Sequence, residues 1–218
     1  GTDVVCVSIR DPSNCDWIDG TEGVKKHVPT VEDLERELEE LLDADLKPLV
    51  EDVHVVVFAI DSSSTITDPD FALQIDAYIA VLGRVIPKHL EDVAIGVDVF
   101  GGAAKTMFPL QLIRDQADVD RVKALLVSLK TTPRTELNGG GGSRPNEAID
   151  LAVVSIKDSP WAEATNRTIY VSAVGQPLGG TEARDATKRA EDSGTDVVCV
   201  SIRDPSNCDW IDGTEGVK

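Results

Sequence analysis

The sequence predicts an α/β fold: a three-layer sandwich with a mainly parallel central sheet, one antiparallel hairpin and helices on both faces. Two observations predict it. Short runs that are apolar throughout alternate along the chain with segments of helical periodicity, and strands without a polar face are typical of a sheet covered on both sides. A glycine pair, Gly101-Gly102, separates two of these runs and predicts the hairpin.

The expected strands are short apolar runs bounded by turn residues. The run VHVVVFAI at residues 53–60 carries the strongest strand pattern in the chain. In chain order, we expect strands over residues 3–9, 53–60, 93–100, 106–110, 168–174 and 197–202. The stretch from residue 10 to Pro29 is rich in Asp, Gly and Pro and is expected to form a loop.

The expected helices begin at capping residues and carry an apolar stripe. Thr30, with Asp33 three residues later, predicts a helix start resembling a capping box. The apolar stripe of that helix is Val31, Leu34, Leu38, Leu41 and Leu42. Asp68-Pro69 predicts the next start, with Asp as the cap and Pro in the first turn. We expect further helices from Asp118 to residue 129, over residues 147–156, and from Thr181 to residue 192.

The two ends of the chain carry the same sequence. Residues 1–25 read GTDVVCVSIRDPSNCDWIDGTEGVK, and residues 194–218 repeat them without a change, at an offset of 193. The repeat indicates a recent duplication, a window across tandem near-identical units, or a designed overlap, and these three remain open. We therefore divide the chain into residues 1–48, a strand and terminal helix able to complete a neighbouring unit, residues 49–202, the main body, and residues 194–218, the repeat copy.

The charge, the apolar runs and the cysteines limit which partners and compartments are expected. Against 21 basic residues stand 39 acidic ones, for a net charge of −18, so the surface repels phosphate backbones and nucleic acid is not an expected partner. No apolar run reaches the roughly 18 residues of a membrane span, and no membrane insertion is expected. The cysteines are two pairs of copies, Cys6/Cys199 and Cys15/Cys208. They allow either a disulfide in an oxidising compartment or buried free thiols.

The loop after the strand at residues 53–60 carries metal-binding chemistry. Asp61 is followed by hydroxyls at Ser63 and Thr65, and such hard oxygen ligands suit Mg²⁺ or Ca²⁺. The carboxyl end of a strand is also where open α/β sheets bind ligands. The segment VVVFAIDSSSTI resembles the opening strand and metal-binding loop of von Willebrand factor A (vWA) domains, the family of the integrin inserted domains.

Later segments resemble the same family in its own order. VAIGVDVFGGAAKTMFPL resembles its central hairpin, LNGGGGSRPNEAIDLAV its glycine-rich loop and helix, RTIYVSAVGQP its fourth-strand region, and GTDVVCVSI the strand before its last helix. The resemblance implies a metal-ion-dependent adhesion site at Asp61, Ser63 and Thr65, with Ser143 at the position of the family's threonine. Val174 stands where the family has a second Asp. The site is therefore degenerate, and we expect no cofactor or a weakly held Mg²⁺ or Ca²⁺.

Other motifs carry less information. Asn166-Arg167-Thr168 is an N-glycosylation sequon, a surface acceptor in a secreted eukaryotic protein. No G-x-S-x-G motif occurs, and no Walker lysine follows the glycine run at residues 139–142, so we do not expect an enzyme. Asp98 is an acid within an apolar strand, and we expect it at a strand edge or hydrogen-bonded.

These observations predict a structural or adhesive vWA repeat unit of an extracellular fibre or matrix protein. Its expected partners are neighbouring copies of itself, joined head-to-tail through tandem repeats or strand exchange, and an extracellular protein ligand is the other partner considered. The alternative is a monomeric, metal-dependent binding module in which a carboxylate of a protein ligand completes the coordination of the ion.

Overall fold

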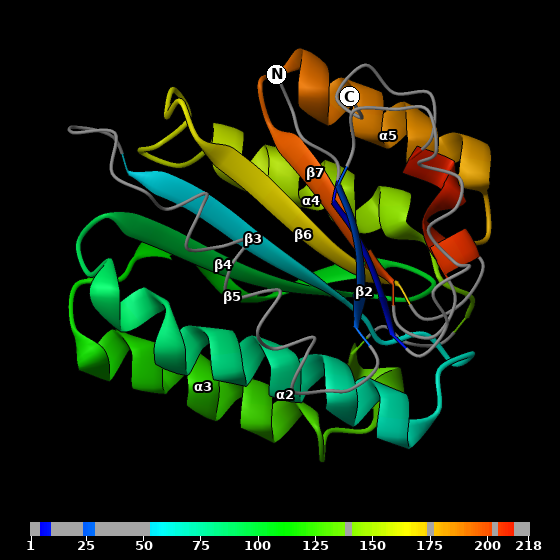
Figure 1. Ribbon diagram of the computed structural model, residues 1–218, viewed down its shortest axis with the longest axis horizontal. Helices are drawn as coiled ribbons and strands as arrows, with labels where there is room; N and C mark the ends of the chain where they lie inside the picture. The colour runs from blue at the N-terminus through cyan, green and yellow to red at the C-terminus, as the bar shows by residue number, and fades with distance from the viewer. Residues whose placement is uncertain are drawn as a thin grey trace.

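A five-stranded sheet forms the centre of the protein. The computed structural model describes residues 5–9, 24–28, 53–137, 141–173, 177–201 and 205–211. The strand order is β5-β4-β3-β6-β7 (Figure 1). The bounds are β3 (His54–Asp61), β4 (Val93–Phe100), β5 (Ala104–Leu112), β6 (Arg167–Ala173) and β7 (Asp196–Ser201). The β4–β5 pair is antiparallel and irregular around Val97, while the other three pairs are parallel. The predicted mainly parallel sheet with one hairpin is therefore confirmed.

Helices cover both faces of this sheet, which confirms the predicted three layers. Figure 1 shows α2 and α3 on one side of the strands and α4 and α5 on the other. The helices are α2 (Asp68–Arg84), α3 (Gln116–Leu129), α4 (Pro145–Lys157) and α5 (Gly180–Asp192). Within the described residues, three short 3₁₀ helices accompany them: η2 (Ile86–Lys88), η3 (Arg134–Leu137) and η4 (Pro205–Ile211). No helix within the described ranges is long and apolar enough to cross a membrane.

The central strand β3 supplies apolar side chains to two separate cores. Val56, Phe58 and Ile60 belong to the core that includes residues of α2 and α3. Val55, Val57 and Ala59 belong to the core that includes residues of α4 and α5. Side chains alternate between the faces of a strand, so a strand buried on both faces must be apolar at every position. This burial explains the continuous apolar run of β3 and fixes the strand at the centre of the sheet.

The N-caps of α2, α3 and α5 lie one to three residues before the predicted ones. Helix α2 is capped by Thr67, whose hydroxyl accepts a hydrogen bond from the backbone of Asp70, rather than by Asp68. Helix α3 is capped by Asp115, which accepts from the backbone of Asp118 at 3.0 Å. Helix α5 follows Gly179 rather than Thr181. Several capping residues stand close together at each start, and the sequence pattern does not show which of them leaves the helical conformation.

A second, two-stranded sheet lies beside the main one. Strand β1 (Val5–Ile9) pairs in parallel with β2 (Val24–Val28), and Val5 lies opposite Val24. Strand β1 also lies against β7, as Figure 1 shows. The expected loop from residue 10 to Pro29 is thus wrong at β2: the sequence VKKHV has neither a continuous apolar run nor strict alternation, which hid the strand. The helix predicted from Thr30 lies outside the described residues.

Candidate cation site at the carboxyl end of the sheet

The loop that follows β3 brings its three predicted ligands together. Asp61 ends the strand with no exposed surface, and its Oδ1 accepts a hydrogen bond of 2.9 Å from the backbone N–H of Ser63. The hydroxyl oxygens of Ser63 and Thr65 lie 2.8 Å apart and share a hydrogen bond. A carboxylate and two hydroxyls are therefore held within one tight turn, as the spacing of the three residues predicts.

The glycine-rich loop packs directly against this turn. The backbone N–H and the hydroxyl of Ser64 both donate to the carbonyl of Gly141, at 3.1 Å and 2.9 Å. Gly141 has φ +132°, a conformation that favours glycine. At Gly142, an added Cβ would come within 2.1 Å of Leu178 Cδ1. These two glycines allow the loops after β3, before α4 and before α5 to meet at one point.

Ser143 is the predicted ligand from the glycine-rich loop. Its side chain is 1% exposed, and its Oγ has no hydrogen-bond partner among the described residues. The backbone carbonyl of Ser143 accepts from the N–H of Leu178 at 2.8 Å, so the residue is held at the junction of the three loops. A buried hydroxyl without a partner is costly, and a cation is one species that would satisfy this one.

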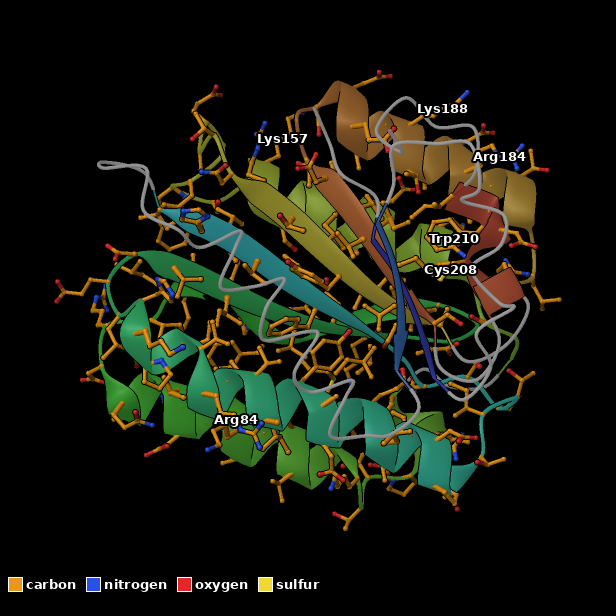
Figure 2. All side chains as sticks on the ribbon, in the orientation of Figure 1. Arg84, Lys157, Arg184, Lys188, Cys208 and Trp210 are labelled. Atoms are coloured by element: carbon orange, nitrogen blue, oxygen red, sulfur yellow. A yellow bond between two sulfur atoms is a disulfide. The ribbon has the colours of Figure 1, made fainter. Side chains whose placement is uncertain are left out.

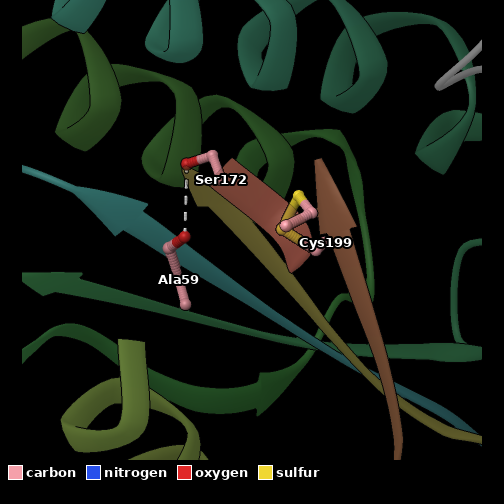
Figure 3. The surroundings of a disulfide bond; sticks show 4 residues. Ala59, Ser172 and Cys199 are labelled. Atoms are coloured by element: carbon pink, nitrogen blue, oxygen red, sulfur yellow. Dashed lines mark hydrogen bonds between the residues drawn. A yellow bond between two sulfur atoms is a disulfide. The ribbon is translucent and has the colours of Figure 1, made fainter. Parts of the chain in front are cut away.

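A buried network of hydrogen bonds from α2 and β6 holds the backbone of Asp61. The amide nitrogen of Gln74, on α2, donates to the carbonyl of Asp61 at 3.1 Å. The hydroxyl oxygen of Ser172, on β6, lies 3.3 Å from the carbonyl of Ala59 (Figure 3). It also lies 2.6 Å from Gln74 Oε1, and its single proton can serve either acceptor. This network ties the ends of β3 and β6 to α2, and nothing in the sequence pattern predicted it.

Arg134, on η3, holds the same loop from the solvent side. Its guanidinium donates to the carbonyls of Ser63, at 3.1 Å, and of Ile66. It also pairs with Asp68 and stacks over the ring of Phe71, 5.3 Å from the ring centroid. One cation thus neutralises the partial charges of two loop carbonyls. The contacts come from a residue about 70 positions away in sequence, so sequence spacing could not reveal them.

The side chains at this site offer few oxygen ligands for a hard divalent cation. One carboxylate and the hydroxyls of Ser63, Thr65 and Ser143 are oxygen ligands of the kind that Mg²⁺ and Ca²⁺ accept. Across the described residues there is no group of three or more His, Cys, Asp or Glu side chains arranged to hold a metal. Val174, the residue at the expected second Asp, lies outside the described residues. With a single carboxylate, the residues present favour weak binding over tight binding.

A disulfide joins the edge strand β7 to η4. Cys199 and Cys208 are bonded, with 5.9 Å between their Cα atoms. Figure 3 shows the bond at Cys199 on β7, and Figure 2 labels Cys208 and Trp210 on η4. Trp210 is 3% exposed, and its carbonyl accepts from Arg184 of α5 at 3.4 Å. The side chain of Cys6, and Cys15 as a whole, lie outside the described residues.

Two further predicted residues lie away from this site. Asp98 is 2% exposed within β4, which is not an edge strand. Burial raises its pKa to about 6, against a hydrogen bond from Thr106 that lowers it, so the hydrogen-bonded alternative describes it. Asn166 precedes β6, and its amide nitrogen is buried without a hydrogen-bond partner within the described ranges. A glycan at Asn166 therefore requires a different side-chain rotamer and remains a prediction.

Comparison with known proteins gives one family and several structures of the same fold. A family model described as von Willebrand factor type A domain matches residues 56–211. Manganese-loaded TRAP protein of Plasmodium vivax aligns with TM-score 0.57 at 13% identity, over 73% of this chain and 61% of that one. The SpRpn10 VWA domain aligns with TM-score 0.53 at 14% identity, over 75% of this chain and 82% of that one.

Proximal thread matrix protein 1 of the mussel byssus, whose structure has a zinc-occupied MIDAS motif, aligns with TM-score 0.57 at 17% identity. The alignment covers 98% of this chain and 54% of that one. This chain thus spans less than two thirds of the TRAP and byssus chains. At these identities the likeness shows the fold alone. A search of curated proteins finds no match to the sequence.

Proposed function

Because this chain belongs to the von Willebrand factor type A family, we propose that it is a structural, adhesive module of an extracellular fibre or matrix protein. Its principal partners are further copies of itself, and it acts by binding rather than by catalysis. The observation that carries the proposal is the repeat: an identical 25-residue segment stands at both ends of the chain. Within this one chain, strand β1 of the first segment lies against strand β7, which contains part of the second.

Two more observations support an extracellular module. The disulfide between Cys199 and Cys208 suits an oxidising compartment, because cytosolic thiols are kept reduced. The net charge of −18 suits a protein that must stay soluble at high concentration before it assembles. The byssus protein, although similar only in fold, is a thread matrix protein.

The test is self-association of the purified protein. We expect light scattering to report masses above one chain as concentration rises toward the millimolar range, and electron microscopy to show linear assemblies. The spacing along them should be about one domain diameter, roughly 40 Å for a chain of this size. A chain that remains a monodisperse monomer at every concentration would rule out the structural role.

The second candidate is a metal-dependent module that binds a protein ligand. The buried, unpartnered hydroxyl of Ser143, on a loop that packs against Ser64, favours it. Asp61, Ser63, Thr65 and Ser143 would hold the ion, which would supply an open coordination position for a ligand carboxylate. Contacts from Gly141 to Ser64, from Gln74 to Asp61 and from Arg134 to Ser63 would hold the loop that carries three of these side chains.

A thermal shift with metal tests this candidate. If the dissociation constant is about 1 mM, 10 mM Mg²⁺ stabilises the fold by about 1.4 kcal/mol, which raises the Tm by roughly 3–6 °C for a domain of this size. Asp61→Ala should abolish the shift, whereas Asp92→Asn, a change at an exposed residue distant in sequence from the loop, should preserve it. No shift with Mg²⁺, Ca²⁺ or Mn²⁺ in the unmodified protein would eliminate the candidate.

A further inference from the structure

Strand β7 and helix η4 together fill a slot along the main body of the protein. Every residue of β7 pairs with β6, and Val200 of β7 is buried in the core that includes residues of α2 and α3. Ile211 of η4 is buried in the core that includes residues of α4 and α5. Polar contacts reach the same segment from the main body: Arg167 donates to the carbonyl of Gly194 at 3.2 Å, and Arg184 holds η4 through a carbonyl. The segment therefore closes both cores at this edge of the sheet.

A second segment of the chain has the chemistry to make the same contacts. Residues 1–25 repeat residues 194–218 without a change, at an offset of 193. The counterparts of the two buried aliphatic residues are Val7 and Ile18. Strand β1 of this first segment lies against both β7 and η4, so part of it is already beside the slot. A contact that the main body makes with the second segment can therefore be made with an identical residue of the first.

We propose that this slot is a binding site for two segments of one chain: residues 194–211, which occupy it here, and residues 1–18, which can replace them. The exchange needs no unoccupied edge of the sheet, because the incoming segment takes over the contacts that the outgoing one gives up. The Cys199–Cys208 bond lies wholly within the outgoing segment, so no bond between that segment and the main body has to break. The inference goes beyond the proposed function, since it concerns a single chain and does not depend on association between copies.

The chain is long enough for residues 1–18 to reach the slot. A strand placed there parallel to β6 ends at the carboxyl end of the sheet, whereas β3 begins at the opposite end. The connection must therefore span the eight residues of a strand such as β3, about 26 Å, and cross β6 sideways, about 10 Å. Residues 19–53 supply this connection. Even if it were helical throughout, at 1.5 Å per residue, it would extend over about 50 Å.

The two connections to the main body decide which segment prevails. Strand β7 begins four residues after the end of α5, so the second segment is held by a short turn. The first segment is held by a much longer connection, and loop-closure entropy disfavours it between about 10-fold and 100-fold. Moving it also breaks the ladder between β1 and β2. The second segment is therefore the major occupant, and the first takes its place when the second is damaged.

Matched substitutions in the full chain test the exchange. Val200→Asp/Ile211→Asp places two carboxyl groups at buried positions of the second segment, Val7→Asp/Ile18→Asp makes the same changes in the first, and a third variant combines all four. Urea unfolding would give the equilibrium constant of each. We expect the combined variant to be less stable than the product of the two separate losses by at least about 100-fold, because only there does no intact segment remain to fill the slot.

The ¹⁹F NMR spectrum of protein labelled with 5-fluorotryptophan identifies the occupant directly. Trp210 is 3% exposed in the slot, and Trp17 is its counterpart in the first segment. Their resonances would be assigned with Trp17→Phe and Trp210→Phe. In the Val200→Asp/Ile211→Asp variant, we expect Trp17 to take the chemical shift that Trp210 has in the unmodified protein, and Trp210 to move to the shift of a solvated indole.

Three results would overturn the inference. The first is a combined variant whose loss equals the product of the separate losses, and the second is a Val200→Asp/Ile211→Asp variant that cannot fold although its mirror variant folds. The third is a dimer of that variant by light scattering at about 10 µM, far below the roughly millimolar effective concentration of a linked segment, because the slot would then be filled by another copy. Linear assembly of the unmodified protein is measured separately, so the proposed function stands or fails independently of these results.

Discussion

Replacing Asp98 by asparagine should stabilise this protein at neutral pH. The carboxyl group is 2% exposed in the middle of β4, and burial raises its pKa from 3.8 to about 6. A shift of about two units corresponds to roughly 3 kcal/mol at 1.36 kcal/mol per unit. The side chain is nearly isosteric in the Asp98→Asn variant, and one oxygen can still accept a hydrogen bond from Thr106. The amide nitrogen takes the place of Oδ2, which is buried without a hydrogen-bond partner among the described residues, and its unsatisfied donors lower the gain.

The sign of the pH dependence follows from the direction of the shift. A carboxyl whose pKa is raised by folding contributes stability below its unfolded pKa, near 3.8, and this contribution is lost as the pH rises through about 6. Relative to the unmodified protein, Asp98→Asn should therefore be nearly neutral at pH 4 and more stable by up to about 3 kcal/mol at pH 7 and above.

The measurement is urea unfolding of both proteins between pH 4 and pH 8, with the difference in the free energy of unfolding plotted against pH. Other carboxyl groups titrate equally in the two proteins and cancel in the difference. Asp92→Asn, at an exposed position one residue before β4, is the control and should show no comparable rise. A flat difference for Asp98→Asn across this range, or a loss of stability at pH 7, would refute the assignment of a destabilising buried charge.

Three further changes test the packing and the support of the site. The Cys199→Ser/Cys208→Ser double variant, which opens a loop with a sequence separation of nine residues, should lower the free energy of unfolding by about 2–3 kcal/mol in urea titrations. Phe58→Ala removes a ring with no exposed surface whose centroid lies 4.6 Å from that of Tyr78, and should cost about 3–5 kcal/mol by the same measurement. Gln74→Ala leaves the buried carbonyl of Asp61 without this donor and should lower the free energy of unfolding by about 1–3 kcal/mol. Any Mg²⁺-dependent thermal shift should be lost in the same variant.

The fold was largely predictable because its strands are buried on both faces. A continuous apolar run such as that of β3 has few alternatives, and β4 has the same bounds in the structure as in the prediction. Strand β2 was not predicted because it is short and carries two lysines and a histidine in five positions. Helix starts were displaced because neighbouring Thr, Asp and Gly residues compete as caps, as at Asp115 and Asp118.

The candidate site was predictable only where its residues are close in sequence. The grouping of Asp61, Ser63 and Thr65 follows from their spacing along one loop. The contributions of Arg134 and Gln74 arise from tertiary contacts, since each approaches the loop from a different helix, and no local pattern marks either residue. The disulfide partner of Cys199 likewise depends on how η4 folds back onto β7, which the cysteine spacing leaves undetermined.

The parallel order of β3, β6 and β7 has a mechanical consequence. Because these strands run in the same direction, the start of β3 and the end of β7 lie at opposite ends of the sheet. Tension applied between those two points acts along the strands and loads their hydrogen bonds in shear, so the bonds must yield together rather than one after another. If the tension acts beyond Cys208 instead, the bond between Cys199 and Cys208 keeps the segment that it spans from extending. We therefore expect a module with this strand order to resist stretching until a high force is reached and, when pulled from beyond Cys208, to lengthen by less than its full contour.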